Sequence, residues 1–315
     1  MVPDATTISP DRCAAESSAT TAIESWPARE ARLGAFEIRR ALPVREKRLV
    51  GPWCFLDRYG PVSFSEGKPM DLAPHPHIGL QTVSWLLEGE ILHRDSLDSE
   101  VVIRPGQLNL MTSGDAIAHT EETPRKNSGK LSGVQLWIAL PEETRRGAPA
   151  FEHHPDLPKF EAGGGELTVI MGRVGDTVSP ATAHSPLLAA ELTAGRNERS
   201  TIPLRRDFEH AVFVLDGAAS LENQRLVPDV LYYLSAGRDE LCIESLGSQI
   251  LILGGEPFPD EVLMWWNFVA RTPEEIAQAR EDWAAGRRFG EVRGYDGPPM
   301  DAPPLRGRVS PPPAS

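Results

Sequence analysis

The sequence predicts an all-β fold divided between two domains that follow one another in the chain. Its 315 residues exceed what one hydrophobic core usually serves. The chain contains 29 prolines and 27 glycines, and these residues separate short apolar runs, a pattern typical of strands and turns. A break at 141–164, which we interpret as a linker or a long connection, is followed by the same pattern, so the two domains resemble a duplicated unit.

Strands of the first half are expected in three stretches. Residues 82–96, TVSWLLEGEILHRDS, are interpreted as a hairpin because apolar side chains alternate with more polar ones before a turn at Gly89. Residues 99–122 repeat this pattern, with turns at two further glycines. Residues 133–140, GVQLWIAL, form another clear strand.

The second half contains four further strand-like runs and one helix. The runs are LTVIMGRVG, HAVFVLDGAASLEN, VLYYLSAG and SQILILGG. In RTPEEIAQAREDW, Thr272 and Glu275 form a capping box and Pro273 occupies the first helical position. The apolar face of this helix and the aromatic cluster at 265–268 are expected to pack against a barrel.

The two ends of the chain are predicted to lie outside the domains. Residues 1–34 are rich in Ala, Ser, Thr, Pro and Glu and show little apolar periodicity, which indicates a disordered extension. Residues 297–315 form a proline-rich tail. The first domain is therefore expected at 35–145 and the second at 165–290.

Charge and composition exclude several classes of partner. A net charge of −13 and a pI of about 5.1 oppose direct binding to a nucleic-acid backbone. No apolar run is long enough to span a membrane, and the N-terminus lacks the pattern of a signal peptide, so we expect a cytoplasmic protein.

The three cysteines do not suggest a disulfide framework. Cys13, Cys54 and Cys242 are scattered and should be reduced, and Cys54 is expected to be a small buried strand residue.

The stretch HPHIGL places two histidines on either side of a proline. Residues i and i+2 of an extended segment point to the same side, so His75 and His77 can present two imidazoles to one point. Pro76 favours this extended conformation before any ligand binds. One such pair is a weak motif by itself.

A second pair with the same spacing follows in AHTEET. His119 and Glu121 again lie on a predicted strand and project to one face. If both pairs face one barrel interior, His75, His77, His119 and Glu121 supply three nitrogen donors and a carboxylate. This set suits Fe(II), and also Mn, Co, Ni, Cu or Zn.

The stretch from APHPHIGLQTVSW to GDAIAHTEE resembles the metal-binding domain of the pirin family, within the cupin superfamily. The resemblance continues through GVQLWIALP, HAVFVLDG and WWNFVARTPEEI and covers about residues 35–290. It implies two tandem cupin barrels that face each other and one iron held by His75, His77, His119 and Glu121. Family members have shown quercetinase activity, a dioxygenolytic opening of flavonols that releases carbon monoxide, and eukaryotic pirin acts as an iron-dependent regulator through protein partners.

Other residues bear on this resemblance. The general cupin pattern has a glutamate ligand where this chain has Gln81, and Glu121 would supply the carboxylate instead. The second barrel holds only His184 and His210, far apart, so we expect it to be structural and to form a wall over the first site. One interpretation of His93 is a residue that contacts a metal ligand from behind, but we assign it a surface or satisfied polar role. The adjacent His153 and His154 are expected to be solvated.

Two functions from different classes follow. In the first, the protein is an iron-dependent dioxygenase that opens flavonols such as quercetin, with Glu121 as the base that takes the substrate's proton. In the second, it is a redox-responsive regulatory protein that acts on protein partners without turnover. A closed structural metal site is a third possibility, since four protein donors can complete a tetrahedral shell.

Overall fold

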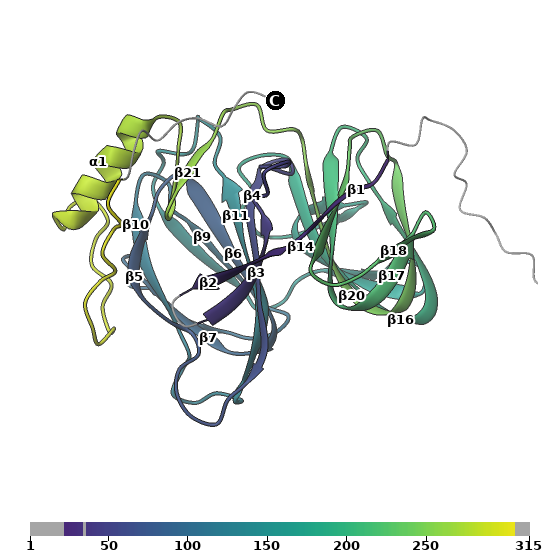
Figure 1. The fold of residues 1–315 in the computed structure, drawn as a ribbon, viewed down its shortest axis with the longest axis horizontal. Coiled ribbons are helices and arrows are strands. Elements are labelled where there is room, and N and C mark those ends of the chain that lie inside the picture. The colour runs from purple at the N-terminus through teal and green to yellow at the C-terminus, as the bar shows by residue number, and fades with distance from the viewer. Residues whose placement is uncertain (1–21, 34–35, 306–315) are drawn as a thin grey trace, which may run out of the picture.

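Two β barrels lie side by side in the computed structural model, which describes residues 22–33 and 36–305 (Figure 1). The prediction of an all-β fold with two cupin domains and one short C-terminal helix is confirmed. Cys13 and residues 306–315 lie outside the described residues.

The first barrel is built from two sheets. One has seven strands in the order β12-β9-β6-β11-β4-β3-β2, and the other has four in the order β5-β10-β7-β8. The strands are β2 (Arg29–Leu33), β3 (Phe36–Leu42), β4 (Trp53–Ser63), β5 (Asp71–His77), β6 (Leu80–Gly89), β7 (Ile91–Asp95), β8 (Glu100–Ile103), β9 (Leu108–Thr112), β10 (Ile117–Glu122), β11 (Lys130–Ala139) and β12 (Ala150–His154).

The second barrel is one continuous sheet of nine strands. Its main order is β1-β19-β17-β20-β16-β14-β13, with β15 and β18 paired at the side. The strands are β1 (Glu24–Pro27), β13 (Lys159–Glu161), β14 (Gly165–Val174), β15 (Thr177–Val178), β16 (Leu187–Pro203), β17 (Glu209–Leu221), β18 (Gln224–Leu226), β19 (Val230–Leu234) and β20 (Glu240–Gly255).

The predicted hairpin at 82–96 is wrong in its pairing. Strand β6 pairs with β9 and β11 in one sheet, whereas β7 pairs with β8 and β10 in the other. Gly89 forms the corner between the sheets. Its φ is +89°, and a Cβ there would lie 2.1 Å from the carbonyl oxygen of Lys130, so only glycine fits this corner.

Two segments that the sequence placed outside the domains are partly ordered. Within 1–34, β1 adds to the second barrel beside β19 and β2 adds to the first beside β3, so the N-terminal segment crosses between the barrels (Figure 1). Within the expected linker, β12 pairs with β9 and β13 with β14. Both segments satisfy the backbone groups of strands that would otherwise be sheet edges.

The barrels join through a shared apolar core. Trp53 and Trp85 of the first barrel pack with Phe213 and other apolar residues of the second, and all three side chains are almost fully buried. The indole N–H groups of Trp53 and Trp85 donate hydrogen bonds across the interface, to the Gly254 carbonyl at 3.0 Å and to the Glu191 carboxylate at 2.5 Å. The interface is therefore apolar, and both of these buried indole N–H groups are satisfied across it.

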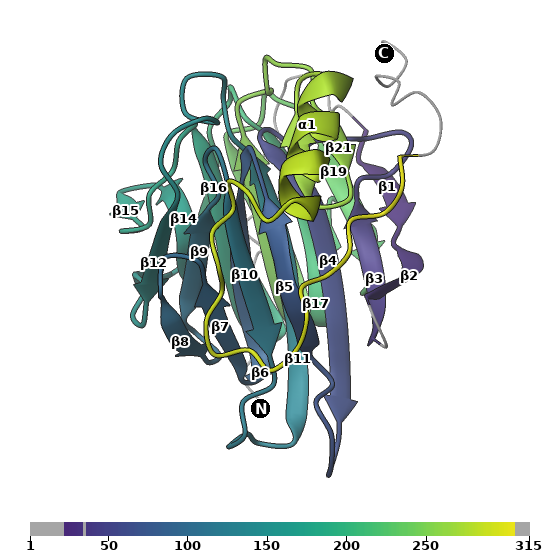
Figure 2. The same cartoon turned by 90° about the vertical axis from the view of Figure 1, so that its left-hand side faces the viewer.

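The chain returns to the first barrel after β20. There β21 (Leu263–Trp265) and β22 (Phe268–Ala270) form a two-stranded sheet. Helix α1 (Pro273–Ala284) follows and lies beside β5 and β10 (Figure 2). The predicted cap is confirmed, because the Thr272 hydroxyl accepts from the N–H of Glu275 at 3.2 Å. The Glu275 carboxylate accepts from the N–H of Arg271 at 2.9 Å. No helix among the described residues is long and apolar enough to cross a membrane.

Candidate metal centre

Strands β5 and β10 bring the two predicted histidine-bearing pairs together. They pair antiparallel, with His119 opposite His75 and Ile117 opposite His77. Because alternate residues of a strand share a face, the side chains of His75, His77, His119 and Glu121 all line one cavity inside the first barrel.

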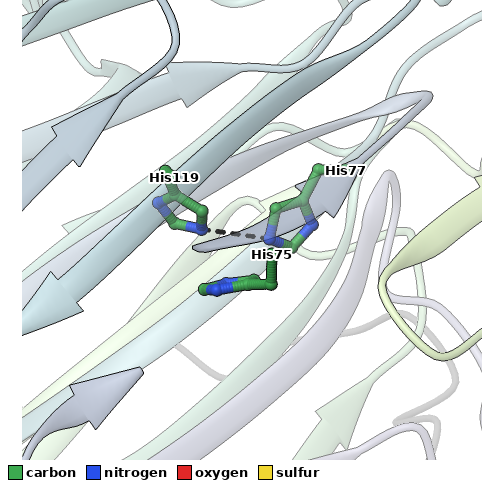
Figure 3. Close-up of side chains that lie close together, drawn as sticks. All are labelled: His75, His77 and His119. Atoms are coloured by element: carbon green, nitrogen blue, oxygen red, sulfur yellow. Dashed lines mark hydrogen bonds between the residues drawn. The ribbon is translucent and has the colours of Figure 1, made fainter. Parts of the chain in front are cut away.

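The three imidazoles converge on one point (Figure 3). Their donor atoms all lie within 4.8 Å of one another, and the Nε2 atoms of His77 and His119 are 3.1 Å apart. All three residues are at most 6% exposed. The structure therefore forms a buried three-histidine metal site.

Hydrogen bonds to the backbone fix two of the rings. Nδ1 of His75 lies 2.8 Å from the carbonyl oxygen of Ala73, and Nδ1 of His77 lies 3.1 Å from that of Asn267. A carbonyl only accepts, so each Nδ1 carries the proton and each Nε2 keeps its lone pair. This arrangement orients both rings for a metal ion.

Burial also keeps the imidazoles neutral. It lowers the pKa of His75 to about 4, and it lowers the pKa values of His77 and His119 well below the usual range, with a further contribution from the neighbouring histidines. Neutral imidazole is the form that binds metals. The site is thus prepared for a cation without prior loss of protons near neutral pH.

The spacing of the donors fits a transition metal. Two nitrogens that each bind one metal ion at about 2.1 Å, with a right angle between the two bonds, would lie about 3.0 Å apart. The Nε2 atoms of His77 and His119 have this separation. Three imidazoles suit iron, copper, nickel and zinc, and a carboxylate nearby extends the range to manganese.

Glu121 lies beside this group but outside it, since its carboxylate is not within the 4.8 Å cluster of donor atoms. Burial raises the pKa of its carboxyl group, although a hydrogen bond from the Ser84 hydroxyl at 3.1 Å opposes this effect. The Ser84 hydroxyl also lies 2.9 Å from Oε1 of Gln135. A hydroxyl has one proton, so it serves both contacts only if the Gln135 amide is turned, with its nitrogen donating to Ser84 and Ser84 donating to Glu121.

The cavity is mostly aromatic and apolar. Its empty space, counted together with the open mouth, is about 490 Å³. Phe55 stacks on Trp137 with ring centroids 4.1 Å apart. Asp57 adds a buried carboxylate that Arg40 binds with two hydrogen bonds of 2.7 Å. The other wall residues are Ile38, Tyr59, Met70, Leu72 and Gln135.

The second barrel contributes none of the described residues that line this cavity, so the expectation that it forms a wall over the site is wrong. Its sheet packs instead on the outer face of strands such as β6. Gln81 belongs to that contact, because its amide nitrogen donates to the Thr112 hydroxyl at 2.9 Å and to the Thr182 carbonyl at 3.1 Å. Gln81 is therefore not part of the metal site.

Three histidines are more enclosed than a surface or solvated role implies. His93 is 4% exposed, and its ring nitrogens lie 3.3 Å from Nδ1 of His119 and 3.0 Å from Oδ2 of Asp95, so the surface role is wrong and the satisfied polar role agrees with its contacts. His153 and His154 are half-buried rather than solvated. They lie on β12, where His153 bonds the Asn109 side chain at 2.7 Å and His154 the Glu152 carboxylate at 3.0 Å. In the sequence, the i, i+2 spacing of His93 and Asp95 on β7 was the signal that could have indicated that these two side chains share a face.

Cys54 agrees with its prediction. It is fully buried on β4, and burial raises the pKa of its thiol to about 12. A protonated, inaccessible thiol neither binds a metal nor reacts as a nucleophile.

Comparison with known proteins gives a consistent result. A family profile described as pirin matches residues 35–138, and one described as the pirin C-terminal cupin domain matches 189–290. A Pseudomonas aeruginosa protein provisionally named quercetin 2,3-dioxygenase is 44% identical over 280 residues, 88% of each chain. A pirin-like protein of Caulobacter vibrioides is 38% identical over 269 residues, 83% of this chain and 93% of its own. The crystal structure of quercetin 2,3-dioxygenase from Acinetobacter baumannii has a TM-score of 0.87 and 45% identity, covering 91% of this chain and 96% of that one.

Proposed function

Because the chain belongs to the pirin family, we propose that it is a mononuclear iron protein that opens flavonols such as quercetin with dioxygen. The observation that carries the proposal is the group of three buried imidazoles at an aromatic-lined cavity. The likeness to quercetin 2,3-dioxygenase of Acinetobacter baumannii supports the choice of substrate class.

In this proposal His75, His77 and His119 would hold the metal, and Glu121, whose carboxylate lies beside their cluster in this structure, would move toward the ion to become the fourth ligand. Fe(II) is the metal we assign, and Mn, Co, Ni, Cu or Zn would also suit these donors. When bound, the metal supplies Lewis acidity toward the 3-hydroxyl group of a flavonol.

The base in the proposed reaction is Glu121. Its carboxylate faces the cavity, and burial raises its proton affinity, so it can take the proton of the substrate hydroxyl. The Ser84 hydroxyl, which lies between Glu121 and Gln135, orients one carboxylate oxygen. The other oxygen carries no hydrogen bond from Ser84 and is the one we assign to proton transfer.

The walls of the cavity supply orientation. A planar polyphenol would pack against Phe55 and Trp137, which already stack on each other. Asp57 provides an acceptor for a substrate hydroxyl at the same wall, since it lies opposite Gln135 in the β4–β11 register. Both features select a flat, hydroxylated aromatic molecule.

The test is oxygen uptake by protein that has been reconstituted anaerobically with one Fe(II), measured with and without quercetin. We expect uptake that requires both quercetin and iron, together with release of carbon monoxide. Metal-free protein and protein reloaded with Zn(II) serve as controls. Protein with one bound iron that consumes no oxygen with quercetin or with other flavonols would contradict the proposal and favour a regulatory role without turnover.

A further inference from the structure

The three imidazoles of the metal site differ in what lies behind them. His75 and His77 each donate to a backbone carbonyl, at 2.8 and 3.1 Å. His119 instead faces a second imidazole, because its Nδ1 lies 3.3 Å from Nδ1 of His93. His93 continues to Asp95, whose Oδ2 lies 3.0 Å from Nε2 of His93.

The positions of the protons along this chain are determined by its two ends. If His119 binds the metal through Nε2, its Nδ1 carries a proton and Nδ1 of His93 must accept it. Nε2 of His93 then carries the proton that goes to Asp95. Oδ1 of Asp95 accepts from the N–H groups of Leu97 at 2.9 Å and Ser99 at 3.1 Å, so the carboxyl group acts only as an acceptor.

The pair is well enclosed. His93 is 4% exposed and Asp95 is 1% exposed. Phe151 of β12 covers the His93 ring in a parallel stack, with centroids 4.3 Å apart. Within the part of the chain that the structure describes, no lysine or arginine forms an ion pair with Asp95, so its charge acts chiefly along the hydrogen bond to His93.

From this geometry we propose that His93 and Asp95 are a positioning pair that fixes the ring of His119 and makes it a stronger electron donor to the metal than His75 or His77. A carboxylate that accepts through an imidazole polarises the next ring more than a neutral carbonyl does. The inference rests on the proposed metal centre and not on turnover, so it can be tested without a substrate.

The decisive variant is Asp95→Asn. It preserves volume and leaves Oδ1 to accept from Leu97 and Ser99, but it removes the negative charge and replaces the acceptor of the His93 Nε2 proton with an NH2 group. We expect the affinity for Fe(II), measured by anaerobic competition with a chelator, to fall by about 10- to 100-fold. We also expect the Fe(III)/Fe(II) potential, measured by redox titration, to become more positive, because a weaker donor stabilises Fe(III) less.

A second variant, His93→Phe, removes the acceptor of the His119 proton and should lower the affinity at least as much. His93→Gln, whose side-chain oxygen can accept that proton, should restore part of it. The matched control is Glu122→Gln. Glu122 is also a buried carboxylate, but it lies on β10, and Arg94 donates a hydrogen bond to it at 2.6 Å. We expect this control to retain the wild-type affinity and potential.

Two results would overturn the inference. One is Asp95→Asn protein with wild-type iron affinity and an unchanged potential. The other is a potential that shifts equally in Asp95→Asn and Glu122→Gln, since the effect would then be general charge removal. Should His93→Phe fail to fold, Asp95→Asn decides alone. A protein that shows the expected shifts but no oxygen uptake would refute the proposed dioxygenase and leave the positioning pair intact.

Discussion

The backbone carbonyl of Asn267 accepts a hydrogen bond from Nδ1 of His77 at 3.1 Å, although 190 residues separate them. Asn267 lies between β21 and β22, next to Trp266, whose φ of +53° is uncommon for a bulky side chain. Phe268 is fully buried and pairs with Ile78, the residue after His77. The segment that follows the second barrel therefore orients a metal ligand of the first.

Phe268→Ala should weaken metal binding from outside the cavity. Loss of the ring leaves a void that costs about 3 to 5 kcal/mol of stability, and the Asn267 carbonyl next to it loses its fixed position. We expect the Fe(II) affinity to fall by about 10-fold, as for other partners that orient a ligand. Chelator competition measures the affinity, and thermal unfolding measures the stability.

The matched control is Phe208→Ala in the core of the second barrel, where the ring is 2% exposed. It should cost a similar amount of stability and leave the iron affinity unchanged. Equal affinities for the two variants would mean that the Asn267 contact does not orient His77.

Each of His75→Ala, His77→Ala and His119→Ala should reduce bound iron severely while circular dichroism shows an intact β fold. The loss should exceed the about 10- to 100-fold cost of disturbing a residue that only orients a ligand. His154→Ala, a half-buried histidine that bonds Glu152, is the control and should retain one iron per chain. Full iron content in any of the three variants would remove that residue from the ligand set.

Glu121→Gln separates binding from catalysis. The amide retains an oxygen donor but cannot take a proton, so we expect iron to remain bound while quercetin-dependent oxygen uptake falls by about 100- to 10,000-fold. Glu122→Gln is the neighbouring control and should keep most of the activity, because that carboxylate binds Arg94. Comparable uptake by the Glu121→Gln and wild-type proteins would exclude Glu121 as the base.

Much of the site could be predicted because its information is local. An H-x-H pair with a central proline is extended by its own covalent geometry, and strand alternation then places both rings on one face. The same rule brought His119 and Glu121 to the cavity. Periodicity also identified the strands and the capped helix.

What could not be predicted depends on contacts between distant segments. Alternation shows that β6 and β7 are strands but not that they enter different sheets, since only tertiary packing selects the partner. The same holds for Asn267, which reaches His77 through the return of the chain, and for His93, whose environment is set by the pairing of β7 with β10. Short polar strands such as β12 lack the apolar alternation that would reveal them.

His210 is a buried polar residue inside the second barrel. It is fully buried among the apolar core residues of β17 and its neighbours. Neither ring nitrogen has a hydrogen-bond partner among the residues that the structure describes. Burial lowers the pKa of His210 to about 4, with a smaller contribution from Arg238.

His210→Leu should therefore stabilise the protein, most of all in acid. An unpartnered buried polar group costs about 1 to 3 kcal/mol, so we expect a gain of about 1 kcal/mol at pH 7. The unfolded chain binds a proton at this histidine below about pH 6.5, whereas the folded protein does so only near pH 4. The free energy of unfolding of the wild type therefore falls by up to about 3 kcal/mol between these two pH values, and the leucine variant avoids this loss.

Urea unfolding of the metal-free proteins at pH 7 and pH 5 measures the difference in the free energy of unfolding. His184→Leu is the control and should follow the wild type. A difference between the His210→Leu and wild-type free energies that stays constant from pH 7 to pH 5 would show that His210 is not the titrating group.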